Sequence, residues 1–165
     1  MAIEIRKPTA FTDLVGYTNP GQAIDVATGD DRTTAATRTP VVTASPSITF
    51  HTFLGAGFTY TALKLVVNYT VTGLVDDTLA IEYSIDGGSN WLQLRAPSAT
   101  NAATIIPISA SLNIAQDLTQ LQVDLDFAKT SKPDYPTISI FDIWTEGTYT
   151  PAAVQQFMPV SFAYG

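Results

Sequence analysis

Residues 79–94 read LAIEYSIDGGSNWLQL, in which an alternating segment is followed by a glycine-rich turn and a second apolar segment. In the first segment apolar residues recur at every second position, and Glu82 and Ser84 lie between them. This period of two is that of a β-strand with one buried face. Asp86, Gly87 and Gly88 suit a tight turn, because glycine adopts positive φ angles without a Cβ clash. The stretch predicts a β-hairpin in an antiparallel sheet.

The same alternation occurs twice more, and helical periodicity is nearly absent from the chain. Amphipathic strands are predicted at 63–71 and 121–127, and weaker strands at 47–54, 91–95, 103–109 and 135–150. In the last of these the apolar phase changes between Ile140 and Phe141, which predicts a bulge or a strand covered on both faces. Short strands separated by turn residues indicate an all-β fold, a single antiparallel β-sandwich of the jelly-roll type.

The chain length of 165 residues fits one domain. We expect three parts along it. Residues 1–45 lack an apolar period and are rich in Pro, Gly, Asp and Thr, so they predict an extended arm or loop packed on the core or on a neighbour. Residues 46–150 form the sandwich, and residues 151–165 form either a C-terminal strand or an interaction tail.

Composition argues against most enzyme chemistry. The chain has no Cys and a single His, His51, which excludes thiolate and paired-His zinc sites. A net charge of −7 argues against binding to nucleic acid. The N-terminal stretch MAIEIRKPTAFTD lacks an apolar signal region, and no later run approaches the roughly 20 apolar residues of a membrane span. We therefore expect no cofactor, no metal, no catalytic residue and no membrane partner.

Charged residues are few, and their distribution is uneven. They make up 14% of the chain, against about 25% in an ordinary soluble domain. None occurs between Arg38 and Lys64, between Arg95 and Asp117, or after Glu146. Either the loops are simply neutral and Thr-rich, or these surfaces meet other protein, because interface cores are depleted in charge. For the tail we favour a protein interface, with partner-binding residues Phe157, Met158, Val160, Phe162 and Tyr164.

Clustered carboxylates offer weak metal or catalytic candidates. Asp25, Asp30 and Asp31 suit a hard cation such as Ca²⁺, but their spacing lacks the EF-hand pattern and indicates a solvated turn. The pairs Asp76 with Asp77, and Asp124 with Asp126, could serve glycoside hydrolysis. A turn and an outward strand face are, however, where carboxylates commonly act only as solubilising groups. His51 has no catalytic motif around it and predicts a packed strand histidine.

The motif SIDGGSNW has the spacing Ser-x-Asp-x-Gly-x-x-Trp and resembles the Asp-box of sialidases and other surface β proteins. That resemblance implies a structural turn, not a catalytic site. Tyr83, Trp91 and Trp144 could together form a sugar-stacking platform, or each could pack in the core or at an edge. The first alternative describes a carbohydrate-binding module.

The order of several segments resembles a β-sandwich family common among structural proteins of tailed bacteriophages. The segments are NPGQAIDVATGDDRTTAA, TALKLVVNYTV, DDTLAIEYSIDGGSNWLQL, DLTQLQVDLDF and ISIFDIWTEGTYT, covering roughly residues 19–150. The resemblance implies a non-enzymatic subunit of a virion, such as a capsid cement or decoration protein. Its partners would be copies of itself and other virion proteins, the major capsid protein among them. The alternative is a carbohydrate-binding module or tail adhesin that uses Trp91, Tyr83 and loop carboxylates.

Overall fold

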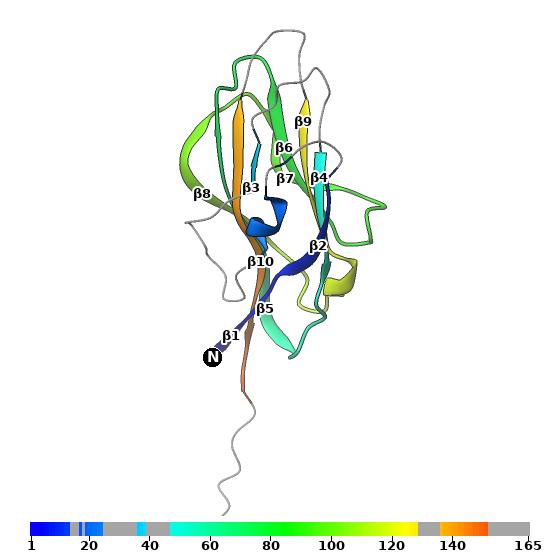
Figure 1. The fold of residues 1–165 in the computed structure, drawn as a ribbon. Coiled ribbons are helices and arrows are strands. Elements are labelled where there is room, and N and C mark those ends of the chain that lie inside the picture. Colours follow the sequence, from blue (N-terminus) through cyan, green and yellow to red (C-terminus); the bar gives the residue numbers. More distant parts are fainter. Residues whose placement is uncertain (14–16, 18, 25–35, 39–46, 129–135, 152–165) are drawn as a thin grey trace, which may run out of the picture.

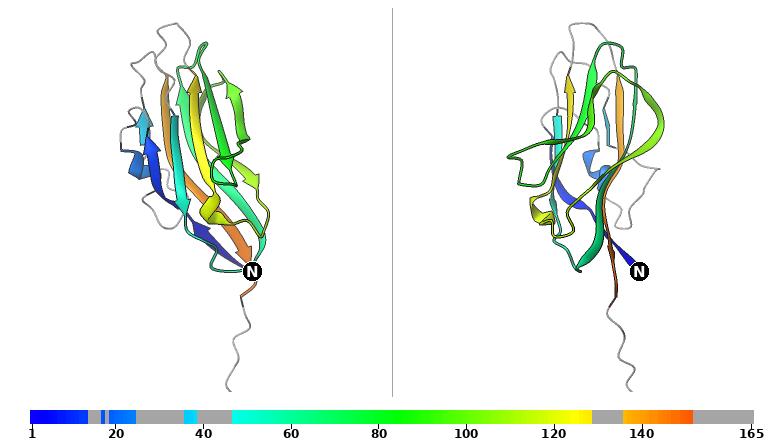
Figure 2. Two further views of the ribbon diagram at one scale, coloured as in Figure 1. Left: turned by 90° about the vertical axis from the view of Figure 1, so that its right-hand side faces the viewer. Right: turned by 180° about the vertical axis from the view of Figure 1, so that it is seen from behind.

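A computed structural model describes residues 1–13, 17, 19–24, 36–38, 47–128 and 136–151. These residues form two antiparallel sheets that lie face to face (Figure 1), and the views in Figure 2 show the two layers from the side and from behind. The predicted all-β sandwich is confirmed. In the described part of the chain, no helix is long and apolar enough to span a membrane.

Each sheet combines strands that are distant in the sequence. The first sheet has the order β1 (Ala2–Arg6), β10 (Thr137–Tyr149), β5 (Tyr60–Thr72) and β8 (Ala102–Ser111), and β3 (Ala36–Arg38) also pairs with β10. The second sheet has the order β2 (Pro8–Asp13), β4 (Ser47–Phe53), β9 (Gln122–Ala128), β6 (Thr78–Ser84) and β7 (Leu92–Ser98). Two short 3₁₀ helices, η1 (Pro20–Ala23) and η2 (Leu118–Gln120), lie in the connections.

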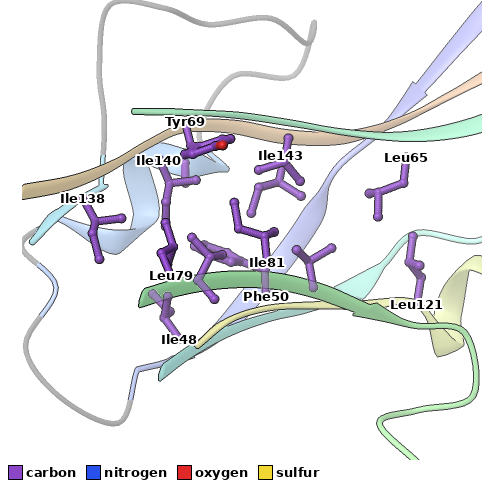
Figure 3. Packing of buried hydrophobic residues seen from close by; sticks show 14 of the residues in the cluster. Ile48, Phe50, Leu65, Tyr69, Leu79, Ile81, Leu121, Ile138, Ile140 and Ile143 are labelled. Carbon is purple, nitrogen blue, oxygen red and sulfur yellow. The ribbon is translucent and has the colours of Figure 1, made fainter. Parts of the chain in front are cut away.

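The inward faces of the two sheets form one hydrophobic core. Alternate residues of β5, β6 and β9 point into it, as their period of two predicts. Figure 3 shows these side chains meeting from both sheets. The fully buried members include Ile48, Phe50, Leu65, Leu79, Ile81, Leu121, Ile138, Ile140 and Ile143.

Strand β10 carries the predicted irregularity. Its register against β5 shifts between Ile140 and Asp142. Ile140 lies opposite Tyr69 before the shift, and Ile143 lies opposite Val67 after it, so both isoleucines point inward. The Asp142 side chain, just after the extra residue, is fully buried and pairs with Lys7. The change of apolar phase in the sequence has this bulge as its cause.

Residues 2–13, within the segment for which we expected an arm or loop, form edge strands of both sheets. β1 pairs with β10, and β2 pairs with β4. Between them the chain crosses from one sheet to the other at Lys7, whose ammonium lies 2.5 Å from Oδ1 of buried Asp142. An edge strand of five or six residues needs few apolar positions, so its alternation is too short to distinguish from a loop. Most of the remaining arm residues, 25–35 and 39–45, lie outside the described residues.

A polar cluster fixes the end of the sandwich where β1 begins. Glu4 accepts hydrogen bonds from the Tyr60 hydroxyl, from Gly57 N at 3.1 Å and from Arg6 Nη2 at 2.5 Å. Burial and the Glu4 carboxylate raise the pKa of Tyr60 to about 12, so the phenol stays protonated and donates. The Tyr60 ring fills the space that a Cβ on Gly147 would occupy. Glycine is therefore required at this position of β10.

Replacing Gly147 by alanine should lower the free energy of unfolding by about 1–3 kcal/mol, because the new methyl group overlaps the Tyr60 ring. Chemical denaturation followed by circular dichroism measures this loss. Gly55→Ala is the matched control, since a Cβ there would meet only Thr119 Cγ2 at an ordinary 3.8 Å. Equal stability of the two variants would contradict the packing described for Tyr60.

Candidate functional site

The turn between β6 and β7 is held by its own side chains. Buried Ser84 accepts a hydrogen bond from Gly88 N at 2.8 Å and donates one to Asp86 Oδ1 at 2.7 Å. Asp86 in turn accepts from Asn90 N at 2.9 Å and from Asn90 Nδ2 at 2.6 Å. Gly87 and Gly88 have φ angles of 73° and 90°. The structural role predicted for SIDGGSNW is confirmed.

These hydrogen bonds also determine the chemistry of Asp86. The side chain and backbone of Asn90, with Ser84, lower the pKa of Asp86 to about 2. The group is a carboxylate throughout the physiological range, and its oxygens already accept several hydrogen bonds. Asp86 is therefore an acceptor that organises the turn, and it is poorly suited to act as a general acid.

The turn is anchored to the connection before β9 as well. Gly87 N donates to the Gln120 carbonyl at 2.9 Å, and Gln116 Nε2 donates to the Ile85 carbonyl at 3.0 Å. Figure 1 shows the turn beside η2, at whose N-terminus Asp117 accepts a hydrogen bond from Thr119 N at 3.0 Å. Contacts on two sides leave the turn little freedom to move.

Trp91 lies on this anchored turn with 37% of its surface exposed. Its indole packs over Gly88, because a Cβ built on that glycine would lie 3.6 Å from Trp91 Cζ2. The strand register places Gln93 opposite Glu82, and Gln122 opposite Ser84. Glu82, Gln93 and Gln122 therefore belong to the outward face of the second sheet, and Gln122 lies with Trp91 beside Gly88. We call the group formed by Glu82, Asn90, Trp91, Gln93 and Gln122 the Trp91 surface.

Carboxylates continue this outward face. Glu82 of β6 lies directly opposite Asp124 of β9, and Asp126 lies two residues further on the same face. Thr49 Oγ1 donates to Asp124 Oδ1 at 2.6 Å. Burial, and then repulsion from Asp126 and Glu82, raise the pKa of Asp124 to about 6 despite the Thr49 hydrogen bond. Among the described residues, no group of three His, Asp or Glu side chains is arranged to hold a metal ion.

The arrangement suits recognition of a polar ring-shaped ligand. An exposed indole supplies a flat apolar surface, while the neighbouring amides both donate and accept hydrogen bonds. Glu82 and Asp124 lie side by side as cross-strand neighbours and offer further hydrogen-bond acceptors to such a ligand.

The three aromatic residues considered either as a sugar-stacking platform or as packed in the core or at an edge do not lie together. Tyr83 is half-buried and packs against the core. Trp144 is 6% exposed and belongs to the first sheet, opposite Val66. The platform hypothesis is therefore wrong in its three-residue form, because strand phase turns Tyr83 inward and sheet topology separates Trp144. Trp91 alone of the three is exposed.

Other candidate residues are placed as follows. His51 is half-buried on β4 and contacts Thr12 at 3.1 Å and Thr52 at 2.8 Å, as expected of a packed strand histidine. Asp77 is fully buried, although a solvated pair with Asp76 was expected. The candidates Asp25, Asp30 and Asp31 lie outside the described residues, and so do the tail residues Phe157, Met158, Val160, Phe162 and Tyr164.

Sequence reasoning identified Trp91 but missed its polar neighbours Glu82, Gln93 and Gln122. The alternation within each strand does assign Glu82 and Gln122 to outward faces. Which outward residues become neighbours depends on the order and register of β9, β6 and β7. Only the tertiary structure supplies that pairing.

Comparison with known proteins gives a general likeness only. No known family profile and no curated protein sequence matches the chain. Among solved structures, it is similar to a pectin-binding carbohydrate-binding module, with 15% identity, a TM-score of 0.41, and coverage of 83% of this chain and 88% of that one. The module TmCBM61, solved with β-1,4-galactotriose, has 11% identity, a TM-score of 0.44, and coverage of 87% and 86%.

A third similar structure is CBM28, a carbohydrate-binding module specific for non-crystalline cellulose. It has 12% identity, a TM-score of 0.41, and coverage of 69% of this chain and 76% of that one. Identities and TM-scores this low assign no family and no ligand.

The raised pKa of Asp124 predicts a pH-dependent stability. An ordinary Asp titrates near pH 3.9, so folded protein binds this proton more tightly than unfolded protein does between about pH 4 and 6. The contribution of Asp124 to the free energy of unfolding therefore becomes unfavourable as pH rises through that window. Asp124→Asn should raise the unfolding free energy near pH 7.5 by about 1 kcal/mol, after allowance for solvent screening, and change it little near pH 4.

Denaturation curves at both pH values test this expectation. Asp126→Asn is the control, because Asp126 is exposed and the substitution removes only the repulsion between Asp126 and Asp124. The control should therefore raise the free energy of unfolding by less than Asp124→Asn does. A gain of the same size at both pH values, or a loss near pH 7.5, would show that Asp124 is not the destabilised carboxylate described above.

Proposed function

We propose that this protein is a non-catalytic carbohydrate-binding module that binds a sugar at the Trp91 surface. One observation carries the proposal: an exposed indole stands on a turn whose backbone and side chains donate hydrogen bonds to Ser84, Asp86 and Gln120, and amide side chains lie nearby. A structural tryptophan would need no such exposure. The sandwich likeness to solved carbohydrate-binding modules agrees with this proposal but does not carry it.

The chemistry of a pyranose fits this surface. Its C–H groups form an apolar face that can stack on the Trp91 indole, and its hydroxyl rim can hydrogen-bond to Gln93, Gln122 and Asn90. Because the turn is already ordered, binding costs less conformational entropy than it would on a free loop. Affinity then depends on stacking at Trp91 more than on any single hydrogen bond.

The charge of the surface favours neutral sugars. Glu82, Asp124 and Asp126 lie on the same outward face, and the whole chain carries a net charge of −7. Uronates, sulfated sugars and sialic acids would meet repulsion there. Neutral hexoses offer hydroxyl donors to these carboxylates instead.

A second candidate function is that of a structural subunit of a bacteriophage particle, located in the virion. Its support is the exposure of apolar side chains at one end of the sandwich, Ile3, Leu54, Phe58 and Ile114, together with a charge-free C-terminal segment. Exposed apolar patches of this kind mark contacts with other proteins. A tail adhesin would combine this role with sugar binding.

Glycan-array screening, followed by calorimetric titration with the best ligand, tests the main proposal. Trp91→Ala should weaken binding by about 2 kcal/mol, or roughly thirtyfold in Kd, because it removes the stacking surface. Val75→Ala, at the far turn of β6 and 65% exposed, is the control and should bind normally. Binding to no glycan, or undiminished binding by Trp91→Ala, would overturn the proposal, and binding to emptied capsids would then favour the second candidate.

A further inference from the structure

Apolar side chains are exposed together where β1 begins and β10 ends. Ile3, Leu54, Phe58 and Ile114 are between 49% and 61% exposed. Figures 1 and 2 show the N-terminus and the end of β10 at this same end of the sandwich. Phe58 and Ile114 line one hollow, and we call these two residues, with Tyr149, the apolar end.

The apolar end has a definite shape. Phe58 stacks on Tyr149 with ring centroids 3.9 Å apart and an angle of 3° between the planes. The loop that carries Phe58 is also tied to β1, because Gly57 N donates to Glu4. A hollow of about 340 Å³ lies beside the stacked rings, lined by Ala56, Phe58, Thr59, Ile114, Ala115 and Gln116. An apolar strand could rest its side chains there.

The loops around the apolar end contain no charged residue that would oppose contact with another apolar surface. The two loops that form the hollow contain no charged residue between positions 54 and 59 or between 112 and 116. Glu4 and Arg6, the nearest charged pair on β1, are bound to each other at 2.5 Å. A surface of this composition gains from contact with another apolar segment.

The C-terminal segment has matching chemistry and begins at this end. β10 ends at Tyr149, which itself stacks on Phe58, and residues 152–165 follow Pro151. They read AAVQQFMPVSFAYG, with no charge, and Met158, Val160, Phe162 and Tyr164 recur at every second position. That period predicts a strand with one apolar face. Fourteen extended residues span roughly 45–50 Å, enough to reach a neighbouring molecule.

The sequence of the C-terminal segment gives less support for a turn that would bring the segment back onto its own molecule. Residues 152–158 lie between Pro151 and Pro159 and contain no Gly, Asn, Asp or Pro, the residues that reverse a chain. The apolar end of another copy then offers the complementary surface.

We infer that the C-terminal segment of one copy binds the apolar end of a second copy, with its alternating apolar side chains against Phe58 and Ile114. The contact is heterologous, since a segment on one molecule meets a different surface on the next. Repetition of this contact forms a ring or an open chain of subunits. The inference does not depend on sugar binding at Trp91.

Two single variants of the full chain test each side of the contact. Ile114→Glu places a charge in the hollow, and Phe162→Glu places one on the apolar face of the segment. Each should reduce self-association at least tenfold in sedimentation velocity, with unchanged thermal unfolding. Val75→Glu at the opposite end and Gln155→Glu outside the apolar phase add the same charge and should associate like the wild type.

Mixing the two disrupted variants gives the decisive readout. The Ile114→Glu variant keeps an intact segment, and the Phe162→Glu variant keeps an intact apolar end, so an equimolar mixture should form dimers and nothing larger. Wild-type protein that stays monomeric at all concentrations would overturn the inference, as expected if each segment covers its own molecule. Association that survives both substitutions, or a mixture that remains monomeric, would overturn it as well.

Discussion

The antiparallel pairing of β5 with β10 is the constraint on which the rest of the structure depends. Both strands have thirteen residues, and their register runs from Thr137 opposite Thr72 to Tyr149 opposite Tyr60. The bulge in this pairing precedes buried Asp142, which meets Lys7 at the crossing from β1 to β2. This ion pair ties the crossing between the two sheets to β10. Because the ladder joins segments far apart in sequence, its formation costs more loop-closure entropy than that of a local hairpin.

The first sheet supports the Trp91 surface by completing the core on which the second sheet packs. That support keeps β6, β9 and β7 in register, and the register brings Trp91 beside Gln93 and Gln122. The apolar end has a separate origin, since it follows from where β10 and the N-terminus emerge. Gln116 connects the two regions, because it lines the hollow at the apolar end and donates to Ile85 at the turn.

Much of the architecture could be predicted from the sequence, because half-buried strands leave a period of two. Strands β5, β6 and β9 were identified in this way, and the phase change near Ile140 indicated the bulge. The edge strand β1 was missed, since five residues carry too little periodicity. Trp91 could be selected from its motif, but its neighbours depend on register, which no local pattern encodes. The inward direction of Tyr83 is likewise a property of the assembled sheet.

The two tryptophans of the chain allow a direct test of the proposed sugar site. Trp91 is exposed, whereas Trp144 is buried in the first sheet, so their indole N–H groups report on different environments. In a two-dimensional ¹H–¹⁵N spectrum, titration with a neutral oligosaccharide should shift the indole signal of Trp91 and leave that of Trp144 unchanged. A saturable shift confined to Trp91 is the result we predict. Ligand binding that leaves the Trp91 signal in place would contradict the account.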